Sequence, residues 1–437
     1  MTHIGFGLKP KWQWAALVMG ICTMGVPALT EADETAPPPV PASAPAPSTV
    51  PPATEAKQVA EVADEAAPPA AAVEQKATVP VAEAKPADAP APPDDALTRP
   101  LSASAWGRIS NVFQGSDPEQ LNDVSQNVEV DLLLGGRIHK HVGWQANFVA
   151  TYGPKQELDA MGVPTGKVSG DITGSASILD LIGQIEFAPE VNVWVGRMLV
   201  PSDRSNFSGA WFMAPWNYPG FYQAFSPPVG PRQGPFGRND GATIWGQTGG
   251  GMFKYYAGAF DLFDPSQSPL FSGRINVALL APEPGYYHSS SYYGKDILAI
   301  GVGGQYKKNG SLTPMGADAY AEANADVLYE KVLPGKGVLD VEGAFYLFSG
   351  DGEALDNHFY ALASYLIPQE LGIGKIQPLV RFQGASPKDG SSMWQILEVQ
   401  AGYIIAPYAA RLALLYQRND VAGATSNAVI VGVQLQK

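Results

Sequence analysis

Residues 317–327 read ADAYAEANADV, and this stretch decides the fold. Every odd position in it carries Ala or Val, while the even positions carry Asp, Tyr, Glu, Asn and Asp. An alternation with a period of two places the two kinds of side chain on opposite faces of an extended strand. The stretch therefore predicts a β-strand with one apolar and one polar face.

The same alternation returns throughout residues 101–437, in segments of about ten residues separated by turn-forming residues. Beyond the N-terminal region, no apolar run is long enough for a membrane-spanning helix. One face is apolar in strand after strand, as in a transmembrane barrel whose apolar residues face lipid and whose polar residues face a lumen. We predict an all-β, antiparallel transmembrane β-barrel of about 16 strands. The predicted strands cover 103–115, 127–139, 143–152, 175–188, 190–200, 240–248, 251–261, 272–281, 296–308, 317–331, 338–349, 357–368, 376–386, 392–406, 408–418 and 426–437.

Charge and cysteine content exclude several classes of protein. The chain carries 28 basic and 42 acidic residues, a net charge of −14, so it lacks the excess of basic residues expected of a nucleic-acid binder. Its one cysteine, Cys22, lies in the apolar N-terminal run. The mature chain is therefore expected to have no disulfide, thiolate metal site or cysteine nucleophile. We predict no cofactor and no metal.

The N-terminal hundred residues predict export. Lys9 and Lys11 precede an apolar run from Trp12 to Val26, which predicts a signal peptide over 1–28; an uncleaved inner-membrane anchor is the alternative. Residues 29–100 are rich in Pro and Ala and predict a disordered linker. An even number of strands places both ends of the 101–437 barrel in the periplasm of a Gram-negative cell, with the linker there as well.

The longest connection between predicted strands, 201–239, is the third extracellular loop by this count. It is rich in Pro, Gly and aromatic residues, so burial in the barrel mouth is more favourable than exposure to water. A loop folded into a lumen narrows it and influences selectivity. The alternative is an outward loop at a subunit contact. The residues expected at the constriction are Arg204, Trp211, Trp216, Tyr218 and Arg232.

The alternation and the position of the long loop indicate which charged side chains line the pore. Opposing rows of acids and bases would create a field across the lumen that favours small hydrated solutes. The alternative is that these charges only solvate the wall and pair with one another. The predicted pore-lining residues are Arg137, Arg197, Arg238, Arg274, Arg381, Arg411, Glu129, Asp131, Asp318, Glu322, Asp326, Asp340 and Glu342.

Several short motifs resemble the phosphate-selective porin family (porins O and P), in matching order and spacing. They lie at 195–201, 238–246, 254–261, 300–306, 363–366 and 377–382. The resemblance implies a trimeric porin of the outer membrane whose third loop folds inward. It also implies a ladder of arginines along one wall, to which Arg197, Arg238 and Arg381 could belong. The chain departs from the family in the loop 201–239, which has no lysine, and in its excess of inward acids.

The predicted function is passive diffusion of small hydrophilic solutes or ions, with phosphate and other anions among the candidates. The expected partners are membrane lipid, lipopolysaccharide and two further copies of the chain, without nucleic acid. One alternative is a non-conducting barrel that the linker tethers to the cell wall. A barrel enzyme is the other, although His139 and His141 fall in a predicted turn and His288 in the long connection 282–295.

Overall fold

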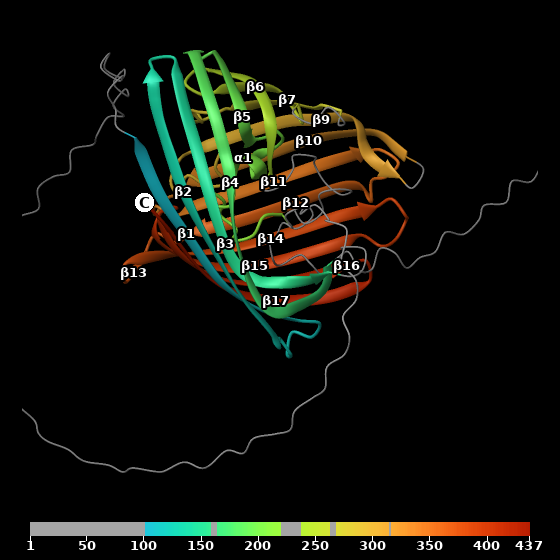
Figure 1. Cartoon of the computed structure of the whole chain (residues 1–437). Helices are drawn as coiled ribbons and strands as arrows, with labels where there is room; N and C mark the ends of the chain where they lie inside the picture. The colour runs from blue at the N-terminus through green and yellow to red at the C-terminus, as the bar shows by residue number, and fades with distance from the viewer. Residues whose placement is uncertain (1–100, 159–163, 220–236, 263–267, 314–315) are drawn as a thin grey trace, which may run out of the picture. The chain divides into compact units, whose positions relative to one another are not determined.

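The computed structural model describes residues 101–158, 164–219, 237–262, 268–313 and 316–437 (Figure 1). The predicted signal peptide and linker lie outside the described residues, as does Arg232. Within the part that is described, no helix is long and apolar enough to cross a membrane.

The described chain is almost entirely strand. One short helix, α1, follows β5, and all other elements are strands of a single antiparallel sheet. The strands are β1 (Ser102–Gly115), β2 (Asp123–His139), β3 (Val142–Leu158), β4 (Pro164–Ala188), β5 (Val191–Leu199), β6 (Arg238–Thr248), β7 (Phe253–Phe260), β8 (Leu270–Ala278), β9 (Ile297–Thr313), β10 (Gly316–Val332), β11 (Val338–Ser349), β12 (Leu355–Leu366), β13 (Glu370–Leu371), β14 (Gly374–Pro387), β15 (Trp394–Ala406), β16 (Ala410–Val421) and β17 (Ala424–Gln436), and the helix is α1 (Arg204–Ser208).

The sheet closes on itself into a barrel. Strand β1 pairs with β2 on one side and with β17 on the other, so that Arg108 lies opposite both Glu129 and Gln434. The two-residue β13 pairs only with β14, which leaves sixteen strands in the wall. Closure removes the free edges whose backbone groups lipid could not satisfy. The predicted antiparallel barrel is confirmed, and each predicted strand overlaps an observed one.

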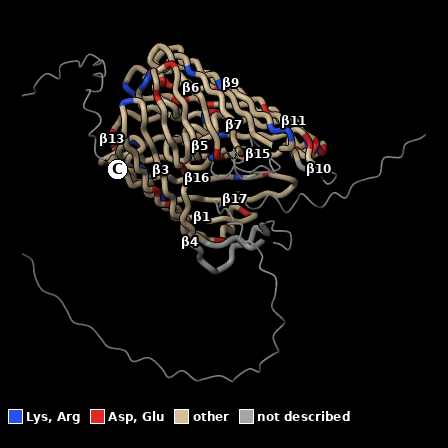
Figure 2. Tube along the Cα trace, turned by 45° about the horizontal axis from the view of Figure 1, so that its top comes forward, with Lys and Arg blue, Asp and Glu red and all other residues tan. Residues whose placement is uncertain are grey.

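Burial in the wall is the inverse of that in a soluble protein. In β10 the apolar Val327 is 37% exposed, while its neighbour Asp326 is 3% exposed. Large exposed apolar side chains occur on strands all around the barrel, as on a surface that faces lipid. Uncharged residues predominate along much of the wall, and charged residues gather towards the ends of strands such as β10 and β11 (Figure 2).

The described parts of two long connections enter the barrel from opposite ends. Residues 200–219, which follow β5, carry α1, and this helix lies within the ring of strands (Figure 1). The loop 279–296 joins β8 to β9 at the end of the barrel where β1 begins and β17 ends. These two termini of the barrel meet there, since Ala105 N donates to Lys437 O at 2.9 Å. The sequence predicted a long connection at 282–295 but not that it turns inward.

The orientation of the wall predicts how charge on its outer face will act. Val431 points outward near the middle of β17, and Leu435 points outward near its end. Val431→Arg should lower the free energy of unfolding by about 2–4 kcal/mol, because a cation is most costly at the centre of the bilayer. Leu435→Arg, the matched control, should cost about 0–1 kcal/mol. Denaturant unfolding in lipid vesicles measures both, and equal costs would contradict a lipid-facing wall.

Candidate functional site

The candidate site is the barrel interior, where the loop 200–219 begins with a capped helix. The Asp203 carboxylate accepts from Asn206 N at 3.2 Å, and α1 ends at Gly209, whose φ of 58° suits a residue without a Cβ. Arg204 and Phe207 on this helix are fully buried. The short helix therefore carries the loop across the interior and places Arg204 deep inside the barrel.

Three arginines of the wall hold the next part of this loop by its carbonyl groups. Arg108 of β1 donates to Trp216 O at 2.7 Å, and Arg411 of β16 donates to Met213 O at 2.6 Å. Arg381 of β14 donates to the carbonyls of the two residues after Trp216, at 2.8 and 3.0 Å. Carbonyls of an irregular segment need partners when they are buried, and charged donors form the stronger hydrogen bonds. The guanidinium groups thus anchor the loop.

Aromatic side chains complete this contact between loop and wall. The Arg108 guanidinium lies 4.2 Å from the centre of the Trp216 ring, which is a favourable position for a cation. The indole N–H of Trp211 donates to Asp131 Oδ2 on β2 at 3.0 Å. Trp211 also packs against Trp106 of β1, with ring centres 5.4 Å apart. Trp211, Trp216 and Tyr218 are all buried.

The second inward loop, 279–296, is held by carboxylates of β11. Ser290 Oγ donates to Glu342 Oε2 at 2.6 Å, and Ser291 Oγ donates to Asp340 Oδ2 at 3.0 Å. The two loops meet where Ser290 N donates to Phe212 O at 3.0 Å. Segments that enter the barrel from opposite ends are therefore in direct contact inside it.

Glu330 of β10 provides the strongest anchor of the second loop. Its carboxylate accepts from the backbone N–H groups of Tyr292, Gly294 and Lys295. Tyr293 and Gly294 have positive φ values of 56° and 136°, and such a turn directs successive N–H groups to one anion. The acidic wall thus binds the donors of one loop, as the arginines bind the acceptors of the other.

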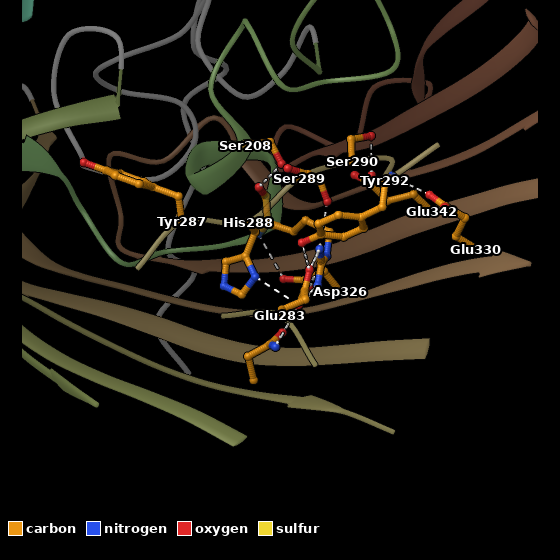
Figure 3. A network of polar contacts seen from close by, with 12 residues as sticks. Ser208, Glu283, Tyr287, His288, Ser289, Ser290, Tyr292, Asp326, Glu330 and Glu342 are labelled. Atoms are coloured by element: carbon orange, nitrogen blue, oxygen red, sulfur yellow. Dashed lines mark hydrogen bonds and ion pairs between the residues drawn. The ribbon is translucent and has the colours of Figure 1, made fainter. Parts of the chain in front are cut away.

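Arg204 latches the two loops together, and Figure 3 shows two of its partners, Glu283 and Asp326. Its guanidinium donates to both oxygens of Glu283, at 2.7 and 2.9 Å, and to Ser289 O at 2.9 Å. Its backbone N donates to Asp326 Oδ2 at 3.2 Å, and Asp326 is also paired with Arg274 of β8 at 2.6 Å. A bidentate pair with both side chains fully buried is held firmly because neither charge can be rehydrated in place.

His288 lies beside this latch, and its pKa depends on its burial and on the surrounding charges. Its Nδ1 is 3.1 Å from Glu283 Oε2 and 3.4 Å from Lys254 Nζ of β7. Burial, followed by the charge of Lys254, lowers the pKa of His288 well below its usual value. Burial opposes ionisation of Glu283, but the Arg204 guanidinium outweighs it and holds the pKa of Glu283 well below its usual value. At neutral pH, a neutral His288 therefore donates to an ionised Glu283.

Other residues expected to line the pore form local pairs inside the barrel. Arg137 pairs with Glu186 at 2.6 Å near the end that bears the termini, and Arg238 pairs with Asp180 at 3.2 Å. Glu129 is partly buried on β2. Glu322 accepts from Asn324 Nδ2 at 2.7 Å.

One expected pore-lining residue points outward, and another is exposed near the start of its strand. Arg197 lies on the same outward face as Val195 and as Ile244 of β6, and it pairs with Asp240 at 3.2 Å. Both faces of β5 are mixed in the sequence, so the parity of Arg197 was assigned wrongly. Asp318 keeps the inward parity of Tyr320 and Glu322, but it is exposed near the start of β10. The irregular register at this point places the extra residues in β9, so the alternation of β10 is unchanged.

The sequence reasoning missed four residues of the interior. Arg108 could have been found, because Ser104, Trp106 and Arg108 continue the polar face of β1. Lys254 lies in a strand with no clear polar face, so the sequence does not indicate its direction. Glu283 lies outside any strand, so no alternation applies to it. Glu330 has no local sequence signal that sets it apart from the other acids of β10; only its contacts with residues 292–295 do so.

Comparisons with known proteins agree with the fold. No protein-family model and no curated protein matches the sequence. The high-pH structure of Pseudomonas putida OprB is similar with a TM-score of 0.53 and 9% identity, over 77% of this chain and 94% of that chain. Salmonella typhi OmpF in complex with daunomycin gives a TM-score of 0.51 and 11% identity, over 77% of this chain and 97% of that chain. At such identities the similarity establishes a shared barrel fold.

The latch predicts a local loss of stability when its charge is removed. Glu283→Gln leaves the Arg204 guanidinium buried with one fewer anion, so the loop 279–296 should open more easily by about 3–5 kcal/mol. Hydrogen exchange of its amides measures this change, while the strand amides should keep their protection. The matched control, Glu186→Gln, removes the partner of the more exposed Arg137 and should cost about 0–1 kcal/mol. Equal effects of the two variants would contradict a latch.

Acid should loosen the second loop through His288. The pKa of His288 is lowered while the loop is held in place. When the loop is released, His288 regains its ordinary pKa and binds a proton below about pH 6.5, whereas in the closed loop it stays neutral. The latch is therefore most stable above that pH and loses stability below it. Ionised Glu283 adds a second loss nearer pH 4. Faster hydrogen exchange of this loop at about pH 5 than at about pH 7, corrected for intrinsic rates, is expected in the wild type. His288→Asn, which cannot be protonated, should show a smaller change.

Proposed function

We propose that the protein is a diffusion channel in the outer membrane of a Gram-negative bacterium, through which small hydrophilic solutes pass without chemical change. The observation that carries the proposal is the inversion of burial in a closed wall, with apolar side chains exposed outside and charged side chains enclosed within. A wall of sixteen strands encloses more space than its own side chains fill, as in porins. Polar side chains inside such a space support a watery passage.

The loops that enter the barrel make this passage narrow. The described residues 200–219 and 279–296 contact one another and cover inward side chains on most of the strands. A passage beside them would admit small hydrated solutes and exclude large ones. Assembly as a trimer and a periplasmic position for residues 29–100 belong to the same proposal.

The charge pairing favours a general channel over one that prefers phosphate. Arg381 is bound to Glu398 at 2.8 Å and to the loop backbone, and Arg238 is bound to Asp180. Guanidinium groups paired in this way attract an anion less than free ones do. Arg197, the third member of the expected ladder, points outward.

A non-conducting barrel tethered by residues 29–100 is the second candidate. It is favoured by the burial of Asp340, Glu342, Arg381 and Arg411, which leaves these charges no contact with a solute. That the barrel is not an enzyme stays a prediction.

Single-channel recording of the refolded protein in planar bilayers tests these candidates. Stable conductance steps with weak or cation-leaning selectivity, and no block of chloride current by added phosphate, are expected. Chloride current blocked by low phosphate would instead establish a phosphate preference. An absence of channels from folded, membrane-inserted protein would refute the proposal and favour the anchor.

A further inference from the structure

The two most charged walls of the interior are already occupied by the loops. The carboxylates of β10 and β11 bind the serine hydroxyls and backbone N–H groups of residues 290–295. The arginines of β1, β14 and β16 bind carbonyls of residues 213–218. Glu342 and Arg381 are therefore buried, and a solute could reach them only by displacing a loop.

The inner face of β2, β3 and β4 is different, because solvent reaches it from both ends of the barrel. Towards the terminal end, Arg137 and Glu186 keep 34% and 27% of their side chains exposed, and Gln145 is partly exposed. Towards the opposite end, Glu129 is partly exposed and Ser177 is exposed. The register places these side chains on the same inward face of neighbouring strands.

Between these two open regions the face is closed by one narrow row. Asp131 is 0% exposed there, and Asn147 and Asp180 are buried beside it. Asn147 Nδ2 lies 3.3 Å from Asp131 Oδ2, the atom that also accepts from the Trp211 indole. The loop therefore covers the β2–β4 face at Asp131 with the Trp211 side chain. A solute that follows this face must displace that one side chain, whereas the other two walls are covered by backbone segments.

Several polar atoms of this row have no hydrogen-bond partner among the residues that the structure describes. They are Asp131 Oδ1, Asn147 Oδ1 and the nearby Arg108 Nε, all of which are buried. Leaving polar atoms in that state is costly, so such atoms in a native structure indicate a place for water or a polar solute. Among the described residues, Asp131 is also without an ion pair, unlike Asp180, which is paired with Arg238.

Within the part of the chain that the structure describes, two of the three carboxylates around this row form no ion pair. Asp180 is neutralised by its direct contact with Arg238. Glu129 lies opposite Arg108 in the register, and Arg108 binds the carbonyl of Trp216. Asp131 lies two residues further along β2 and accepts from the Trp211 indole. Asp131 is therefore the carboxylate without a bound counter-charge at the closed part of the face.

We propose that solutes pass along the inner face of β2–β4 and that Asp131 is the residue that determines their charge preference. Small cations and solutes that carry an ammonium group are the favoured species, because an unpaired carboxylate in a narrow, partly dry passage attracts positive charge. This inference rests on the proposed channel function and assigns its path. Trp211 acts as a positioning residue, since its indole N–H orients the carboxylate.

Reversal potentials in a KCl gradient at about pH 8, where carboxyl groups are normally ionised, test the path. Asp131→Asn should lower the ratio of potassium to chloride permeability by at least about fivefold, because even in bulk water a unit charge about 4 Å away changes the energy of an ion by about 1 kcal/mol. Asp318→Asn, the same change at an exposed carboxylate of β10 on the opposite wall, is the matched control and should leave the ratio unchanged. A shift in the control alone, or equal shifts in both, would overturn the proposed path.

Thiol labelling provides a second measurement that does not depend on the Asn variant folding normally. The mature chain is expected to lack cysteine, so Asp131→Cys and Asp318→Cys would each carry a single thiol. A cationic methanethiosulfonate reagent should reduce the current through the first variant and leave the second unchanged. The reverse pattern would refute the path. A wild-type protein without any conductance would instead refute the channel function on which the path rests.

Discussion

Backbone hydrogen bonding in a medium without water is the constraint on which this structure depends. A sheet can cross lipid only if every strand has two neighbours, and the pairing of β1 with β17 meets that condition. Once the wall is closed, its outer face must be apolar, and the polar side chains of each strand face the interior. The buried charges of the barrel are thus a consequence of closure.

Most of those interior charges are bound by the chain itself. The loop 200–219 offers carbonyl oxygens to the arginines of one wall, and the loop 279–296 offers N–H and hydroxyl groups to the carboxylates of another. Irregular backbone at membrane depth is tolerated only where such partners exist. Arg204 and Glu283 then join the two loops, so the contents of the interior behave as one connected network.

Net charge is consequently a poor guide to what a solute would meet inside this barrel. Acids outnumber bases in the chain, but most inward charges are bound to a loop or to one another. What matters for permeation is the small number of charged groups that stay without a bound counter-charge. Asp131 has this property because Trp211 and Asn147 contact it, and neither of them is charged.

Local pattern alone determined the strands and most inward side chains, because the period of two is a property of each strand and needs no knowledge of its neighbours. It placed Asp326, Asp340, Glu342, Arg274, Arg381 and Arg411 on the inner face without a structure. It was wrong at Arg197, where the two mixed faces of β5 hide the parity. The inward course of residues 279–296, the Arg204–Glu283 latch and the grip of Glu330 were decided only by the tertiary structure. Each of these contacts joins residues far apart in the chain, and they come together only when the barrel has closed.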